Sequence, residues 1–164
     1  MTQADIKVRH AEAADADQWL RLRAALWPEE DPSGLADDVT RFFQSPGDGQ
    51  GSEPEAVLVA SVGRDLSLVG FAEISRRAYA EGCDTSPVGF LEGWYVEPDY
   101  RRHGIGRALV AAAEQWARSL GCREFASDAV AENMLSAAAH KAIGFEEVGL
   151  IRCFRKSLTR ESDQ

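Results

Sequence analysis

The stretch that decides the fold is FLEGWYVEPDYRRHGIGRALV, residues 90–110. Its apolar first part predicts a strand that ends at Val96, Pro98 predicts a turn, and a helix is expected to begin after Gly104. The turn holds the pattern Arg-x-x-Gly-x-Gly, from Arg101 to Gly106. Glycines let ligand oxygens approach the backbone closely, and the unpaired N–H groups at the start of a helix attract anions. The stretch therefore predicts a loop that binds a pyrophosphate.

Two common phosphate-binding loops do not fit this spacing. A P-loop ends in Gly-Lys-Ser/Thr, whereas Gly106 is followed by Arg107 and Ala108. A dinucleotide-binding loop has a third glycine where this chain has Leu109. What remains resembles the coenzyme A loop of the GNAT N-acetyltransferases, whose pattern is Gln/Arg-x-x-Gly-x-Gly/Ala. From the loop alone an alternative stays open, in which the glycines only form a tight turn between packed elements.

Length and charge narrow the class of protein. The chain has 164 residues, 45% of them hydrophobic, which is ordinary for one globular domain. We expect a single domain over residues 1–158 and a flexible polar tail over 159–164. The net charge of −9 argues against a nucleic-acid partner, because binding phosphates needs clustered Lys and Arg. A negative field favours a cationic small-molecule substrate, although a merely soluble acidic surface explains the charge equally well.

Cysteine content and hydropathy bear on the compartment. The three cysteines, Cys83, Cys122 and Cys153, show no Cys-x-x-Cys spacing, so neither a disulfide framework nor a metal site is expected. No apolar run approaches the roughly 20 residues of a membrane span, so no membrane partner is expected. The N-terminus lacks the basic and apolar pattern of a signal peptide. The expected location is cytoplasmic.

Hydrophobic periodicity predicts an α/β fold. The expected helices lie around residues 15–27, 35–43, 105–120 and 133–143. The expected strands lie at 6–9, 56–62, 68–75, up to 96, 122–129, and as two short strands within 145–157. Residues 45–52 are rich in Gly and Pro, which is typical of a surface loop. This order predicts a mixed sheet with helices on its faces.

The resemblance to GNAT enzymes implies a specific use of the strand before the loop. In that family it splays from its neighbour, so the N–H groups at Trp94, Tyr95 and Val96 bind the pantetheine arm and the thioester carbonyl. Gly93 is where a bulge is easiest, because glycine in a strand often marks one. A regular central strand is the alternative. The loop residues implied to contact acetyl-CoA are Arg101, Arg102, His103, Gly104, Ile105, Gly106 and Arg107.

Asn133 and His140 lie seven residues apart, which places them on one face of a helix. The family implies that Asn133 binds the pantetheine arm. It often has a tyrosine four residues before Gly-Phe to protonate the thiolate, but His140 stands there in this chain, before Gly144-Phe145. His140 is therefore the candidate acid, and a packed or solvated histidine is the alternative.

Two carboxylates are candidates for binding the substrate amine and taking its proton. Glu92 interrupts an apolar strand, and Asp128 follows Ala126-Ser127 at the end of the next one. If these strands flank the splay, both acids line its cleft, bind an ammonium group and take its proton directly or through water. The alternative for Asp128 is to cap the following helix. A glycosidase-like acid pair leaves the coenzyme loop unexplained.

Five segments in order make the resemblance narrower, and they look like the aminoglycoside 6'-N-acetyltransferases of the GNAT superfamily. These segments are LWP at 26–28, YAEGCDTSP at 79–87, FLEG at 90–93, GCREFASD at 121–128 and HKAIGFEE at 140–147. The resemblance implies aminoglycoside contacts at Trp27, Tyr79, Asp84, Glu92 and Asp128. Without it, Trp27 and Tyr79 are ordinary core or rim aromatics. One departure is Gly149, where the family can place another acid.

The resemblance implies transfer of acetyl from acetyl-CoA to the 6'-amine of an aminoglycoside, by direct attack in a ternary complex, which would confer antibiotic resistance. Two rivals remain at this level. One is a GNAT enzyme acting on a polyamine, another small amine or a protein N-terminus, and the other is a non-catalytic acyl-CoA-binding regulator. A homodimer is also expected, because residues 150–155 form a strand that could pair across a two-fold axis.

Overall fold

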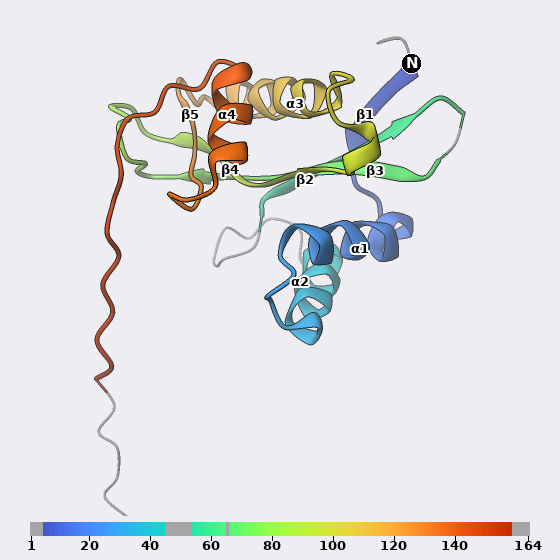
Figure 1. Ribbon diagram of the computed structural model, residues 1–164, viewed down its shortest axis with the longest axis horizontal. Coiled ribbons are helices and arrows are strands. Elements are labelled where there is room, and N and C mark those ends of the chain that lie inside the picture. Colours follow the sequence, from blue (N-terminus) through green and yellow to red (C-terminus); the bar gives the residue numbers. More distant parts are fainter. Residues whose placement is uncertain (1–4, 45–53, 65, 159–164) are drawn as a thin grey trace, which may run out of the picture.

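The computed structural model describes residues 5–44, 54–64 and 66–158. The expected loop 45–52 and the tail 159–164 both lie outside these residues. Figure 1 shows the helices α1 (Ala16–Leu26), α2 (Pro32–Gln44), α3 (Ile105–Ser119) and α4 (Met134–Ala142). The strands are β1 (Ile6–His10), β2 (Ala56–Val62), β3 (Leu68–Arg77), β4 (Val88–Val96) and β5 (Phe125–Ser127), and two short 3-10 turns are η2 (Ala13–Asp15) and η3 (Pro98–Tyr100). None of the helices in these ranges is long and apolar enough to cross a membrane.

The strands form one mixed sheet in the order β1-β2-β3-β4-β5. Strands β1 to β4 pair antiparallel with one another, and β5 pairs parallel with β4. Helices α1 and α2 cover one face of the sheet, while α3 and α4 lie on the other (Figure 1). The predicted α/β fold, with a mixed and mostly antiparallel sheet between helices, is confirmed.

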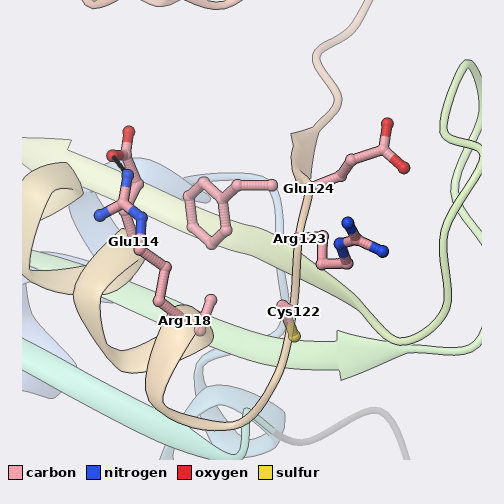
Figure 2. A pocket seen from close by; sticks show the side chains of 7 residues that line it. Glu114, Arg118, Cys122, Arg123 and Glu124 are labelled. Atoms are coloured by element: carbon pink, nitrogen blue, oxygen red, sulfur yellow. Dashed lines mark hydrogen bonds and ion pairs between the residues drawn. The ribbon is translucent and has the colours of Figure 1, made fainter.

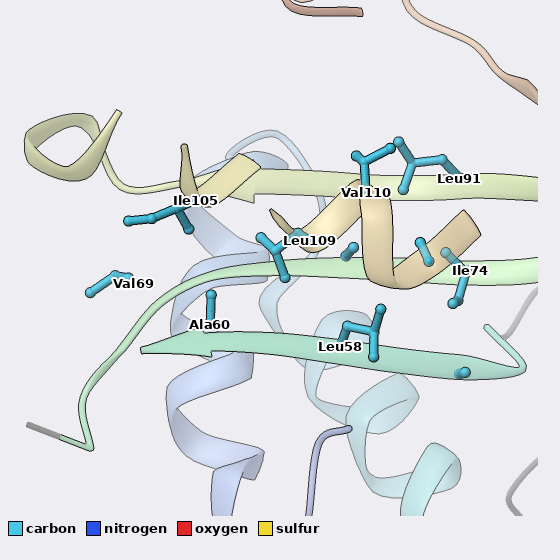
Figure 3. Packing of buried hydrophobic residues seen from close by; sticks show 11 residues of the cluster. Leu58, Ala60, Val69, Ile74, Leu91, Ile105, Leu109 and Val110 are labelled. Atoms are coloured by element: carbon cyan, nitrogen blue, oxygen red, sulfur yellow. The ribbon is translucent and has the colours of Figure 1, made fainter. Parts of the chain in front are cut away.

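The core has two layers because successive side chains of a strand point to opposite faces. On β2, Leu58 and Ala60 pack against α3 residues such as Leu109, as Figure 3 shows. The intervening Val57 and Val59 pack against α1 and α2. Since both faces of β2 and β3 are covered, these strands read as nearly continuous apolar runs.

A bulge interrupts β4 at Glu92. Glu73 of β3 is paired with Gly93, but the next residue, Ile74, is paired with Leu91, so Glu92 is an extra residue. As a consequence Leu91 and Trp94, three positions apart, both pack in the layer of α3. A regular central strand was the alternative at this position, and it is wrong.

The two strands expected within residues 145–157 are not formed. Residues 146–158 contain no helix or strand and are exposed throughout, and we call this segment the C-terminal arm. It runs away from the folded body in Figure 1. Its apolar side chains Leu150, Ile151 and Phe154 are 74%, 68% and 92% exposed. A strand needs a neighbour for its backbone hydrogen bonds, and within the described part of the chain the arm has none.

Candidate active site

The site begins where β4 and β5 separate. Their parallel pairing covers only Gly89 to Leu91 on β4, and it ends at the pair Leu91 and Ser127. From Glu92 to Val96, the edge of β4 that faces β5 has no partner strand among the described residues. An open strand edge presents backbone N–H and C=O groups that a ligand can pair with. The splay predicted between these strands is therefore present.

The loop after β4 has the backbone of an anion site. Arg102 and Gly104 adopt left-handed conformations, with φ of 64° and 86°. Gly104 is the N-cap of α3, whose first residue, Ile105, is buried in the core and fixes the helix start. The unpaired N–H groups of the first helical turn therefore lie at this loop. Arg101, Arg102 and His103 are exposed there, so the residues present suit a pyrophosphate.

Two side chains beside the loop, Arg107 and Trp94, are held in place by contacts within the protein. The Arg107 guanidinium donates to the carbonyl oxygen of Ala142 at 2.9 Å, so it ties α3 to the end of α4. The Trp94 ring packs against Gly106, where an added Cβ would stand 2.8 Å from it. The indole Nε1 of Trp94 is buried and has no hydrogen-bond partner in the described structure. A buried donor without a partner suits a ligand that supplies the acceptor.

Helix α4 carries the next two predicted residues. The Asn133 side chain accepts a hydrogen bond from the backbone N–H of Ser136 at 3.0 Å, so it is the N-cap of α4. The alternative in which Asp128 capped this helix is therefore wrong. The amide N–H groups of Asn133, which is exposed, are not used by this cap.

His140 is a residue of α4, and its side chain contacts the end of β5 and Trp94 of β4. Its Nδ1 is 2.7 Å from the carbonyl oxygen of Ser136, which can only accept, so Nδ1 carries a hydrogen. Its Nε2 is 2.8 Å from the hydroxyl of Ser127. The ring makes edge contacts with Trp94 and Phe145, at centroid distances of 5.5 and 5.2 Å. His140 is thus packed, and it is packed at the point where the strands separate.

The two predicted acids have different surroundings. Glu92 accepts hydrogen bonds from the Ser75 hydroxyl and from Arg77, whose nitrogens lie at 3.0 and 2.6 Å. Asp128 directly follows β5, is exposed, and has no ion-pair or hydrogen-bond partner among the residues the structure describes. Leu91 and Ser127 are paired, and each acid comes directly after one of them: Glu92 follows Leu91, and Asp128 follows Ser127. Sequence reasoning missed Arg77, which compensates the charge of Glu92.

Trp27 stands over the bulge from the other face of the sheet. It follows the last residue of α1, and its ring lies 2.7 Å from where a Cβ would stand on Gly93. The Arg23 guanidinium lies 5.1 Å from the centre of this ring and 2.8 Å from a carboxylate oxygen of Glu73. Burial raises the pKa of Glu73 to about 7, although Arg23 and the Trp19 indole oppose the shift.

The Arg23 and Glu73 pair was also missed from the sequence. The available signal was a charged residue inside an apolar pattern, in α1 and in β3 respectively.

The loop 79–87 carries two further predicted contacts, Tyr79 and Asp84, and both side chains are exposed. Tyr79 is 64% exposed, and a hydrogen bond to Glu81 raises the pKa of its hydroxyl. The backbone N–H of Asp84 donates to Glu124 at 2.9 Å, and the Asp84 side chain is exposed.

A surface pocket of about 230 Å³ lies elsewhere, between the C-terminal half of α3 and the segment before β5 (Figure 2). It is lined by Glu114, Ala117, Arg118, Cys122, Arg123, Glu124 and Phe125. None of these is a predicted site residue. Burial raises the pKa of the Cys122 thiol, which disfavours the reactive thiolate. The pocket is therefore separate from the splay.

Comparisons with known proteins agree with this geometry. Residues 16–145 match the profile of the Acetyltransferase (GNAT) family. An aminoglycoside N(6')-acetyltransferase type 1 of Klebsiella aerogenes is 48% identical, over 92% of this chain and 96% of its own length. A protein of the same name from Stenotrophomonas maltophilia is 45% identical, over 92% and 93%. The structure of AAC(6')-Iy with the bisubstrate analogue CoA-S-monomethyl-acetylneamine is 35% identical, with a TM-score of 0.82 over 93% of this chain and 98% of that one.

Proposed function

The chain belongs to the GNAT acetyltransferase family, and on that premise we propose that it transfers the acetyl group of acetyl-CoA to the 6'-amine of an aminoglycoside antibiotic. The observation that carries the proposal is the open edge of β4 beside the anion loop before α3. A nucleotide pyrophosphate at the loop and a pantetheine arm along the edge fit these two features together. The thioester then lies near the bulge at Glu92.

The reaction is a direct attack of the amine on the thioester carbonyl. A C–N bond forms, the C–S bond breaks, and the sulfur keeps the electron pair. The attacking amine must be neutral, and Asp128 is the proposed base because its carboxylate is exposed and uncompensated. Backbone N–H groups of β4 between Trp94 and Val96 are the proposed donors to the carbonyl oxygen. His140 is the proposed source of the proton for the thiolate.

The proposed acceptor site lies on the face of the sheet that carries α1 and α2. Trp27 supplies an apolar wall for a sugar ring, Glu92 and Asp128 supply negative charge, and Tyr79 and Asp84 lie on a loop at the rim. The net charge of −9 favours a cationic ligand. Acetylation removes one positive charge from the drug and so weakens its binding to RNA, which is the physical basis of resistance. The free cysteines of the described chain favour a reducing compartment, and we propose the cytoplasm.

A homodimer is the proposed assembly. The C-terminal arm exposes Val148, Leu150, Ile151, Phe154 and Leu158, which a stable monomer would not leave in water. The outer edge of β5 has no partner strand in the described structure, and α4 buries none of its residues. Extended at about 3.3 Å per residue, the arm reaches about 40 Å, far enough to lie on a second copy. Exchange of two arms would cover these apolar surfaces at once.

Thiol release from acetyl-CoA with the purified chain tests the proposed function. The acceptor panel pairs aminoglycosides that carry a 6'-amine with matched ones that carry a 6'-hydroxyl, and adds a polyamine and a peptide with a free N-terminus. We expect turnover only with the 6'-amines. Preference for the polyamine or peptide would assign another amine, and binding of acetyl-CoA without turnover on any acceptor would make the chain a regulator.

A further inference from the structure

The Ser127 hydroxyl occupies the point where β4 and β5 part. Ser127 is the last residue of β5, and its partner Leu91 is the last residue of β4 before the bulge. Its oxygen lies 2.8 Å from Nε2 of His140 and 3.3 Å from the carbonyl oxygen of Leu91. A pantetheine arm that follows the open edge of β4 from Val96 toward Glu92 brings its sulfur to this point. This placement rests on the proposed acetyl transfer.

Hydrogen bonding fixes which nitrogen of His140 faces Ser127. Since Nδ1 donates to the carbonyl oxygen of Ser136, one turn earlier on α4, the remaining nitrogen Nε2 is directed at the hydroxyl. Trp94 and Phe145 contact the ring edge-on. The Ser127 hydroxyl is thus the polar group between Nε2 of His140 and the point where β4 and β5 separate.

We propose that Ser127 relays the proton of His140 to the departing coenzyme A thiolate. In neutral His140, Nε2 accepts, so the Ser127 hydroxyl points its hydrogen at the ring. In the imidazolium form Nε2 donates instead, and the hydroxyl hydrogen can turn toward the Leu91 carbonyl oxygen or into the splay between β4 and β5. Protonation of His140 therefore reverses the direction of one hydrogen bond and frees the serine proton for the sulfur.

When the C–S bond breaks, the sulfur takes its electron pair and accepts the Ser127 proton, and the serine oxygen accepts the proton from Nε2. His140 is left neutral and Ser127 is restored. An ammonium first gives one proton to solvent; the neutral amine then attacks, and its nitrogen loses one further proton to Asp128, which passes it to solvent, while solvent returns one proton to His140. Neither residue forms a covalent bond to the acetyl group.

Kinetics of Ser127→Ala, His140→Ala and the double variant test the relay, with the 6'-amine substrate on which the wild type turns over. We expect Ser127→Ala to lower kcat by about 10²-fold, the lower end for general acid catalysis, with both KM values nearly unchanged. Ser127→Thr keeps a hydroxyl and should recover most of kcat. The double variant should be no slower than the slower single variant, because both residues serve one step. Ser119→Ala removes an exposed hydroxyl of α3 as a matched control.

Several results would overturn the relay while the wild type remains active. They are an unchanged kcat in Ser127→Ala, additive losses in the double variant, or failure of the threonine variant to recover a loss that alanine causes. An acetyl group trapped on Ser127 by rapid quench and mass spectrometry would make the serine a nucleophile instead. An inactive wild type would count against the proposed function, so the two failures are distinguishable.

Discussion

Trp27 lies against Gly93 so closely that a Cβ on the glycine would stand 2.7 Å from the indole ring. This contact joins the end of α1 to the bulge of β4, and it places an aromatic wall beside the proposed reaction centre. The Arg23 guanidinium contacts the Trp27 ring, and Arg23 is itself buried and paired with Glu73. The wall proposed for the acceptor is therefore supported by a buried ion pair.

Gly93→Ala should displace the Trp27 ring. Overpacking of this kind costs about 1–3 kcal/mol, so we expect a lower thermal midpoint and at least about a tenfold rise in the KM for the aminoglycoside. Gly34→Ala is the matched control, because the nearest atom to its added Cβ is 3.7 Å away and the residue lies in α2. Equal kinetics in the two variants would remove Trp27 from the acceptor site. Steady-state kinetics and thermal unfolding supply both readouts.

Asp128→Asn should lower kcat by about 10²-fold or more and leave the KM for acetyl-CoA unchanged, because the variant loses the proposed base but not the coenzyme contacts. Glu92→Gln is the comparison. Since Arg77 already compensates the Glu92 charge, we expect mainly a rise of about tenfold in the KM for the aminoglycoside. If both variants keep the wild-type kcat and KM, neither acid serves the amine.

Arg102→Gly separates charge from backbone conformation in the coenzyme loop. Glycine adopts the left-handed φ of 64° without strain, so stability should be preserved or slightly raised. Loss of a charged contact to pyrophosphate should raise the KM for acetyl-CoA about tenfold. Arg123→Gln removes an exposed arginine at the separate pocket and should change neither quantity. An unaltered KM in Arg102→Gly would place the pyrophosphate away from this residue.

Glu73 should make the free energy of unfolding depend on pH. Its pKa is about 7 in the folded protein and near 4.5 when unfolded, so the folded state holds the proton more tightly. This stabilisation is present in full below about pH 4.5 and is lost as the pH rises through 7, by on the order of 3 kcal/mol. In Glu73→Gln the slope between pH 5 and 8 should largely disappear. Denaturant unfolding across this range measures it, and an identical slope in the variant would assign the titration elsewhere.

Leu150→Ser combined with Phe154→Ser should convert the proposed dimer into monomers, because it removes two exposed apolar side chains of the arm. Arg152→Ser combined with Arg155→Ser changes the same segment without removing apolar area, and this control should stay dimeric. Light scattering at several concentrations gives the mass. A monomeric wild type at working concentration would rule the dimer out.

Sequence patterns predicted the four helices and the first five strands, for a physical reason. Strand alternation, helix periodicity and the glycines at 104 and 106 act over a few residues, so their consequences are local. The ion pair of Arg77 with Glu92 depends on strand register and on the bulge, which short-range patterns do not specify. The contact of Ser127 with His140 likewise joins two elements through the packing of α4.

The arm shows a different limit of sequence patterns. The apolar residues Leu150, Ile151, Cys153 and Phe154 predict a strand over residues 150–155. Such a pattern states what a segment can do when a neighbouring strand is available, not where that neighbour is. Among the described residues no strand pairs with the arm, although Lys141 pairs with Glu147 and Val148 lies against Gly82, so Leu150, Ile151 and Phe154 remain exposed.

One inserted residue, Glu92, shifts the phase of β4 and so divides its two duties. Without the shift, Leu91 and Gly93 would share a face; with it, Leu91 and Trp94 pack in the layer of α3, and Gly93 faces Trp27 in the layer of α1, where the acceptor is proposed to bind. Substitutions that alter the drug spectrum can therefore accumulate on one layer without disturbing how the acetyl donor is held. The bulge thereby separates, within a single strand, the face proposed to hold the acetyl donor from the face proposed to hold the acceptor.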